Sequence, residues 1–203
     1  MMAQPLLAGA EAVRAGKYGV CLVAVVYTLL GLVLCGTYAW GIIRLDGEFK
    51  QSGGAMKLWG RINDKGNEWL LSIYFTSIGL AAIGYLPSLA YAFFIAPELP
   101  RGLVNRMCGS LACFFVTELF WMPMCVAYIE SPSSLVYTLI RLQLAVSGIS
   151  GLCWFYFKVF AVPEEVEKTV GAPLRLSAKA GTAIFALHCA ILDATVWPPF
   201  FHQ

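Results

Sequence analysis

Long apolar segments alternate with short polar ones along almost the whole chain. Tyr18 to Ile43 contains no Asp, Glu, Lys or Arg, and neither does Trp69 to Pro97. An α-helix needs roughly 20 apolar residues to cross the ~30 Å hydrocarbon core of a bilayer. Because the apolar segments reach that length, the pattern predicts transmembrane helices.

We expect five such helices, at about residues 18–43, 69–96, 107–129, 134–161 and 180–200. The last is the least regular, because His188, Asp193 and the Pro198–Pro199 pair interrupt it and proline suits a helix end better than its interior. The alternative is four spans followed by a C-terminal helix in a groove. The predicted fold is therefore an all-α integral membrane protein: a bundle of four to five transmembrane helices with short loops, forming one domain over residues 1–203.

Composition agrees with this prediction. Hydrophobic residues make up 59% of the chain and charged residues only 13%, against about 25% charged in soluble domains. The longest polar stretch, residues 44–68, is rich in glycine, which predicts an irregular loop. Its apolar residues Met56, Leu58 and Trp59 indicate that part of the loop folds back onto the membrane. A net charge of +2 without a basic block argues against nucleic acid as a partner.

Basic residues in the loops favour one orientation, with the N-terminus inside. The N-terminal side of the predicted bundle carries Arg14, Lys17, Arg101, Arg106, Lys158, Lys168, Arg175 and Lys179, and the opposite side carries Arg44, Lys50, Lys57, Arg61 and Lys65. The bias is small. The sequence indicates a multi-pass protein but does not identify its membrane: mitochondrial, plastid, endomembrane and plasma membranes all stay open.

Three ionisable side chains interrupt otherwise uncharged segments: Glu118, Arg141 and Asp193. A charge at membrane depth costs at least ~2.5 kcal/mol, so it usually has a partner or a function. Glu118 and Arg141 flank a tight turn on consecutive antiparallel spans, and their depths differ by only ~5 Å. We therefore expect a Glu118–Arg141 ion pair that serves structural packing, a proton or ion path, or a polar substrate site. The alternative is that Arg141 faces a lipid headgroup or a partner subunit.

His188 and Asp193 are the remaining candidates for a buried polar site. They are five residues apart, about 140° around a regular α-helix, so we do not expect a direct pair. We expect Asp193 to meet a donor on another helix or another subunit instead. His188 as an axial ligand to haem or chlorophyll is a minor alternative. Otherwise the sequence predicts no cofactor and no metal site, and all seven cysteines lie in apolar segments. Small residues predict close helix contacts, at Gly31, Gly36, Gly79, Gly84, Gly148 and Gly151.

Motifs of hydrolases and phosphate-binding loops are absent from the sequence, so catalysis is the less favoured class. The leading hypothesis is a non-catalytic subunit of a larger membrane complex, with lipids and other subunits as partners and an organellar energy-converting assembly as one setting. The first alternative is a small transporter or proton-conducting protein that uses Glu118, Arg141 and Asp193. The second is an intramembrane sterol or lipid enzyme.

Overall fold

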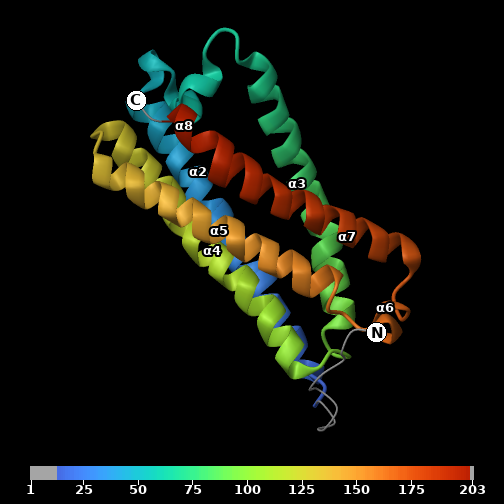
Figure 1. The fold of residues 1–203 in the computed structure, drawn as a ribbon. Helices are drawn as coiled ribbons and strands as arrows, with labels where there is room; N and C mark the ends of the chain where they lie inside the picture. Colours follow the sequence, from blue (N-terminus) through green and yellow to red (C-terminus); the bar gives the residue numbers. More distant parts are fainter. Residues whose placement is uncertain (1–12, 202–203) are drawn as a thin grey trace, which may run out of the picture.

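Five long helices dominate the fold. The computed structural model describes residues 13–201, and within this range it contains no β-strand beyond an isolated bridge between Arg14 and Pro100. The long helices run over Gly16–Glu48, Glu68–Ile95, Arg101–Glu130, Ser134–Val159 and Ala172–Phe201. All five are long and apolar enough to cross a membrane. Figure 1 shows them as one elongated bundle with short connections.

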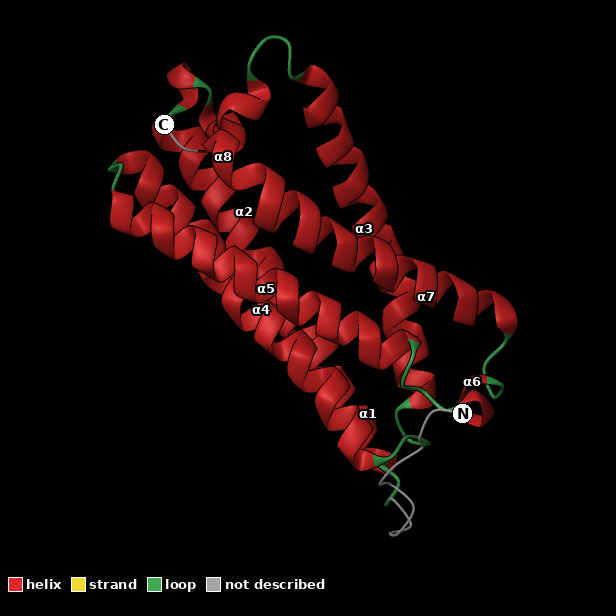
Figure 2. Ribbon diagram, viewed as in Figure 1, coloured by secondary structure: helices red, strands yellow, loops and turns green. Residues whose placement is uncertain are grey.

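Two of the long helices change type along their length. The first consists of α1 (Gly16–Val23), the π-helix η1 (Ala24–Leu30) and α2 (Gly31–Glu48). The fifth consists of α7 (Ala172–Leu187), the π-helix η4 (His188–Val196) and α8 (Trp197–Phe201). The other three are α-helical throughout: α3 (Glu68–Ile95), α4 (Arg101–Glu130) and α5 (Ser134–Val159). In Figure 2 the connection between α2 and α3 is the long one and is partly helical, and the four-residue α6 (Glu164–Glu167) lies before α7.

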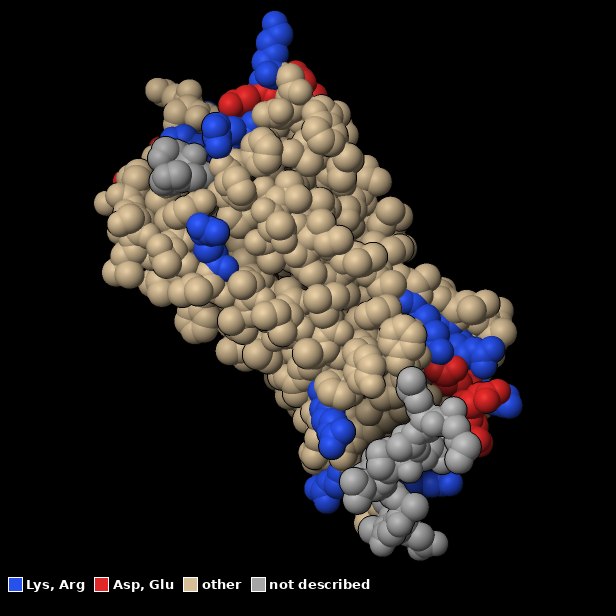
Figure 3. All heavy atoms as spheres, viewed as in Figure 1, with Lys and Arg blue, Asp and Glu red and all other residues tan. Residues whose placement is uncertain are grey.

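The surface of the bundle is largely uncharged. Large apolar side chains are exposed along every long helix, among them Leu32, Ile83, Phe120, Ile149 and Leu187. In the view of Figure 3, charged side chains gather toward the two ends of the molecule, and an almost uncharged band separates them. This is the distribution that a bilayer favours.

The loop of residues 49–67 folds back onto one end of the bundle. It contains the 3₁₀ segments η2 (Lys50–Ser52) and η3 (Gly54–Asn63). Leu58 is buried, and its carbonyl accepts a hydrogen bond of 2.9 Å from the Trp197 indole N–H. Gly60, with φ +48°, lies so close to the C-terminal helix that an added Cβ would be 2.4 Å from the Phe200 carbonyl oxygen. The loop is therefore anchored to α8.

The glycines singled out in the sequence differ in their surroundings. A Cβ added to Gly84 would lie 2.6 Å from the Gly181 Cα, so α3 and α7 cross there at backbone distance. On α5, Gly148 and Gly151 face Ala190 and Ala186 of the fifth helix, and Gly31 faces the Phe115 ring. A Cβ added to Gly36 or Gly79 would meet no atom within 4 Å, so these two face away from the rest of the described chain.

Candidate functional site

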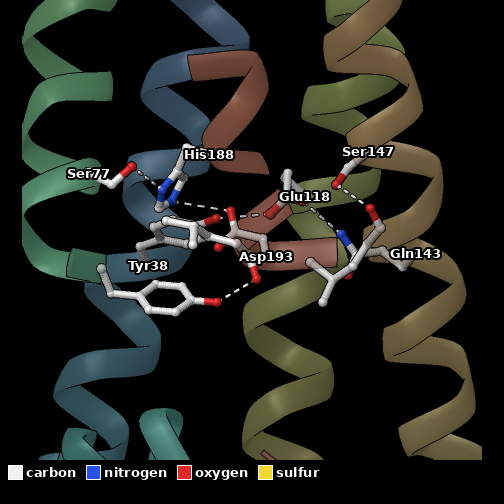
Figure 4. A network of polar contacts seen from close by, with 10 residues as sticks. Tyr38, Ser77, Glu118, Gln143, Ser147, His188 and Asp193 are labelled. Atoms are coloured by element: carbon white, nitrogen blue, oxygen red, sulfur yellow. Dashed lines mark hydrogen bonds and ion pairs between the residues drawn. The ribbon is translucent and has the colours of Figure 1, made fainter. Parts of the chain in front are cut away.

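A network of polar side chains lies inside the bundle, and every long helix contributes to it (Figure 4). Its members are Tyr38 of α2, Ser77 of α3, Glu118 of α4, Gln143 and Ser147 of α5, and His188 and Asp193 of η4. Most neighbours along these helices are apolar. Polar groups in such surroundings are costly unless they are hydrogen-bonded, which explains why they are gathered in one place.

Glu118 is the most deeply buried carboxyl group of the network. Its side chain is 5% exposed and accepts hydrogen bonds from the Tyr38 hydroxyl at 3.0 Å and from the Gln143 amide at 3.1 Å. Both of its oxygens therefore have donors from other helices. The contacts tie α2, α4 and α5 together at one level of the bundle.

The predicted Glu118–Arg141 ion pair is wrong. Arg141 is exposed on the outer face of α5, and its guanidinium carbon lies 5.9 Å from the centroid of the Tyr137 ring on the same helix. Gln143, two positions further, takes the place expected for Arg141. Two residues correspond to about 200° of rotation around an α-helix, so the two side chains lie on opposite faces.

His188 and Asp193 form a direct contact, contrary to the sequence-based expectation. The His188 Nε2 atom lies 3.3 Å from the Asp193 Oδ2 atom. The expectation assumed a regular α-helix, whereas residues 188–196 form a π-helix, in which backbone bonds connect residues five apart. The other imidazole nitrogen, Nδ1, lies 2.9 Å from the Ser77 hydroxyl. Axial ligation of haem or chlorophyll through either nitrogen would break one of these contacts.

The two carboxyl groups lie beside each other at the centre of the network, as Figure 4 shows. Among the described residues, neither has a Lys or Arg partner within 4 Å, and the one ion pair of Asp193 is with the His188 imidazole. The Asp193 side chain is 31% exposed, so it connects the buried network with the outer surface of the bundle. Chemically, this arrangement can hold a proton on a carboxyl group or on His188 and can exchange it within the network.

A second buried ionisable group, Lys158, was not singled out by the sequence. It is fully buried near the end of α5, and its ammonium nitrogen donates a 2.6 Å hydrogen bond to the Ser88 carbonyl. The rings of Trp154, Tyr27 and Tyr91 surround the nitrogen at 4.8, 5.3 and 5.9 Å from their centroids. Aromatic faces stabilise a desolvated cation. Lys158 therefore belongs to the interior of the bundle, and its prediction as a loop cation was wrong.

The Lys158 surroundings hold several helices together. The Trp154 indole N–H donates to the Tyr27 hydroxyl at 2.7 Å, and the Tyr85 hydroxyl donates to the Tyr27 carbonyl at 2.7 Å. The hydroxyl of Ser88 lies 2.5 Å from that of Thr182. The helical spacing of the sequence includes this position. Residues three or four apart in α5 are all buried in the structure: Leu144, Ser147, Gly151, Trp154 and Lys158.

Comparison with protein-family models, with curated proteins and with solved structures found no match for this chain. Among residues 13–201, no group of three or more His, Cys, Asp or Glu side chains is arranged to hold a metal ion. A function must therefore be inferred from the geometry of these sites and not from fold analogy.

Proposed function

We propose that this protein is a multi-pass integral membrane protein and serves as a non-catalytic subunit of a larger membrane complex. Five helices of sufficient length and apolarity support insertion. The outward exposure of large apolar side chains supports it too, because soluble monomers rarely leave such continuous apolar surface in water.

Arg141 is the observation that carries the subunit hypothesis. It projects from α5 among the exposed apolar side chains of Leu139, Leu142 and Val146. Arg141 lies about 10 Å along the helix from its start at Ser134, given a rise of 1.5 Å per residue. A guanidinium in this position within a bilayer needs an anion. Since Glu118 bonds elsewhere, an acidic side chain on a helix of another subunit fits this requirement.

Two further surfaces agree with contacts to other subunits. Gly36 on α2 and Gly79 on α3 face away from the described chain and leave room beside their helices. Small residues of this kind let a neighbouring helix approach closely. Together with Arg141, they give a partner subunit both a charge and close helix contacts to use.

Photo-crosslinking in native membranes tests the proposal. A photoreactive amino acid at Leu142, beside Arg141, should give a discrete protein adduct, whereas the same probe at Leu29 on the first helix serves as the control for random collisions. Arg141→Glu should abolish the adduct and reduce the mass of the gently solubilised particle in native mass spectrometry. Lipid adducts alone at Leu142, with a particle of the mass of one chain, would contradict the proposal, because Arg141 would then be reaching a headgroup.

A second candidate function is proton or ion conduction, and the polar network favours it. Two carboxyl groups, an imidazole and a tyrosine hydroxyl lie in one network, and Asp193 connects that network with the surface. Intramembrane carboxyl and imidazole groups are the usual elements of proton relays. Reconstitution of the purified chain in vesicles with a pH-sensitive dye tests this function. Flux that is lost in Asp193→Asn and kept in Arg141→Gln would favour conduction over the subunit role.

A further inference from the structure

A cavity lies where the loop of residues 49–67 meets the C-terminal helix. Its volume is about 540 Å³, within the range of small-molecule sites. The lining includes the polar side chains of Ser52, Lys57, Arg61 and Asn63 and the apolar side chains of Met56 and Phe200. The cavity thus combines cations and hydrogen-bond donors with an apolar wall.

The two cations of the cavity are not neutralised by the chain. Within residues 13–201, neither Lys57 nor Arg61 has a carboxylate within 4 Å. The Lys57 ammonium lies 4.2 Å from the centroid of the Phe49 ring. Arg61 uses one N–H to donate to the Pro199 carbonyl at 2.7 Å, which holds the guanidinium in place and leaves its other N–H groups for a ligand.

The backbone around the cavity is held by the fold. Gly53 has φ +108° and Gly60 has φ +48°, conformations that suit glycine. Gly60 also touches the backbone of Phe200, and the Trp197 indole bonds Leu58, so the loop keeps its position against α8. A loop anchored at several points presents its cations with little loss of entropy on binding.

The location of the cavity indicates what it meets. It lies between the end of α2 at Glu48 and the start of α3 at Glu68, at the level where two long apolar helices end. The indole of Trp59 in the same loop packs on the rings of Tyr74 and Phe75 of α3. Aromatic side chains and cations at helix ends are typical of the headgroup region of a bilayer.

We propose that this cavity binds a phosphate group through Lys57 and Arg61, with the Asn63 amide as a further hydrogen-bond donor, since the Ser52 hydroxyl already donates to the Phe49 carbonyl. Arg and Lys are the side chains that bind phosphate oxygens best. The apolar wall of Met56 and Phe200 and the interfacial level indicate that the phosphate belongs to an anionic phospholipid headgroup. A phosphate from solution offers the same chemistry. The lipid assignment rests on the membrane insertion proposed above, whereas the phosphate site does not depend on a partner subunit.

Lipid binding to the full chain in nanodiscs tests the proposal. Nanodiscs of phosphatidylcholine with a minor fraction of phosphatidylglycerol are compared by native mass spectrometry of the lipids retained on the protein. We expect the retained lipid to be enriched in phosphatidylglycerol roughly tenfold over the bulk, as two interfacial cations allow. The double variant Lys57→Gln/Arg61→Gln should abolish this enrichment.

The matched control is Lys50→Gln/Lys65→Gln, which removes the same charge from the same loop outside the cavity. The control should keep the enrichment; equal losses in both double variants would overturn the proposal, because diffuse charge attraction would then suffice. Lys57→Gln alone leaves the Arg61–Pro199 bond intact and should reduce enrichment severalfold, which guards against misfolding of the double variant.

A second arm separates lipid from soluble phosphate. Inorganic phosphate is titrated onto the protein in nanodiscs of phosphatidylcholine alone. Saturable binding that Lys57→Gln/Arg61→Gln removes, without phosphatidylglycerol enrichment, would keep the phosphate site and overturn its lipid assignment. Absence of both signals would overturn the site. Failure to enter any nanodisc would instead refute membrane insertion, so the two proposals fail in distinguishable ways.

Discussion

His188 and Asp193 contact each other through side chains that belong to residues five apart in one helix. The 3.3 Å contact exists because residues 188–196 are π-helical. Short π-helical segments are rare and occur frequently at functional sites. Together with the Ser77 contact, the pair ties the fifth helix to α3.

A double-mutant cycle with His188→Gln and Asp193→Asn should therefore reveal coupling. We expect an interaction energy of about 0.5–3 kcal/mol, because both groups are held in contact and partly removed from water. The control is the exposed pair of Glu164 in α6 and Lys168 directly after it, whose coupling should stay below about 0.5 kcal/mol. Unfolding in mixed micelles gives both values. Equal coupling for the two pairs would show that the His188–Asp193 contact has no special role.

Glu118 should couple energetically to Gln143 and not to Arg141. Removing either partner of the buried hydrogen bond leaves a polar group unsatisfied, at a cost of about 1–3 kcal/mol. In the same micelle assay, Glu118→Leu and Gln143→Leu should be non-additive by at least about 0.5 kcal/mol. Glu118→Leu and Arg141→Leu should add. Coupling only to Arg141 would support the Glu118–Arg141 ion pair and contradict the outward orientation of Arg141 on α5.

Gly84 should not tolerate alanine, whereas Gly79 on the same helix should. The added methyl group at Gly84 meets the Gly181 backbone at 2.6 Å, so α3 and α7 must separate, at about 1–3 kcal/mol. At Gly79 the methyl group meets nothing within 4 Å, and the change should be neutral or stabilising by up to about 1 kcal/mol. Thermal unfolding of the two variants decides the matter; equal effects would mean that the close crossing does not exist.

Lys158 should resist amine-modifying reagents in the folded protein. Its side chain is fully buried, while Lys50 and Lys65 are exposed. Modification requires opening of the bundle, so we expect acetylation at Lys158 to be at least roughly tenfold slower than at the two loop lysines. Peptide mass spectrometry after timed labelling measures the three rates, and labelling after unfolding in denaturant should make them equal. Comparable rates before unfolding would mean that Lys158 is not buried among the rings of Trp154, Tyr27 and Tyr91.

The five helices could be predicted from the sequence because apolar length alone decides whether a segment can span a bilayer. The predicted span of 107–129 nevertheless became a helix over Arg101–Glu130, since a helix continues past the apolar region while its backbone bonds can still form. The fifth helix also starts earlier, at Ala172, where Pro173 suits a first turn.

The polar network was only half predictable. Glu118, Asp193 and His188 stood out because they interrupt apolar segments, but depth along two helices says nothing about rotation around them. Along α5, buried and exposed positions alternate with the period of a helix. Gln143 and Lys158 lie on the buried face, whereas Arg141 lies on the exposed face. The His188–Asp193 contact could not be predicted, because no residue type in the segment 188–196 distinguishes a π-helix from an α-helix.

The contacts around Lys158 have a consequence for the order in which the chain is synthesised. Tyr27, Ser88 and Tyr91 all precede Lys158, so they leave the ribosome first and their helices can be inserted before α5 emerges. In the membrane insertion proposed above, α5 alone would bring both Arg141 and Lys158 into the lipid. Under that proposal, insertion of α5 is easiest when Tyr27, Tyr91 and the Ser88 carbonyl are already in place to contact the Lys158 amine, so that membrane entry of this helix depends on the helices already synthesised.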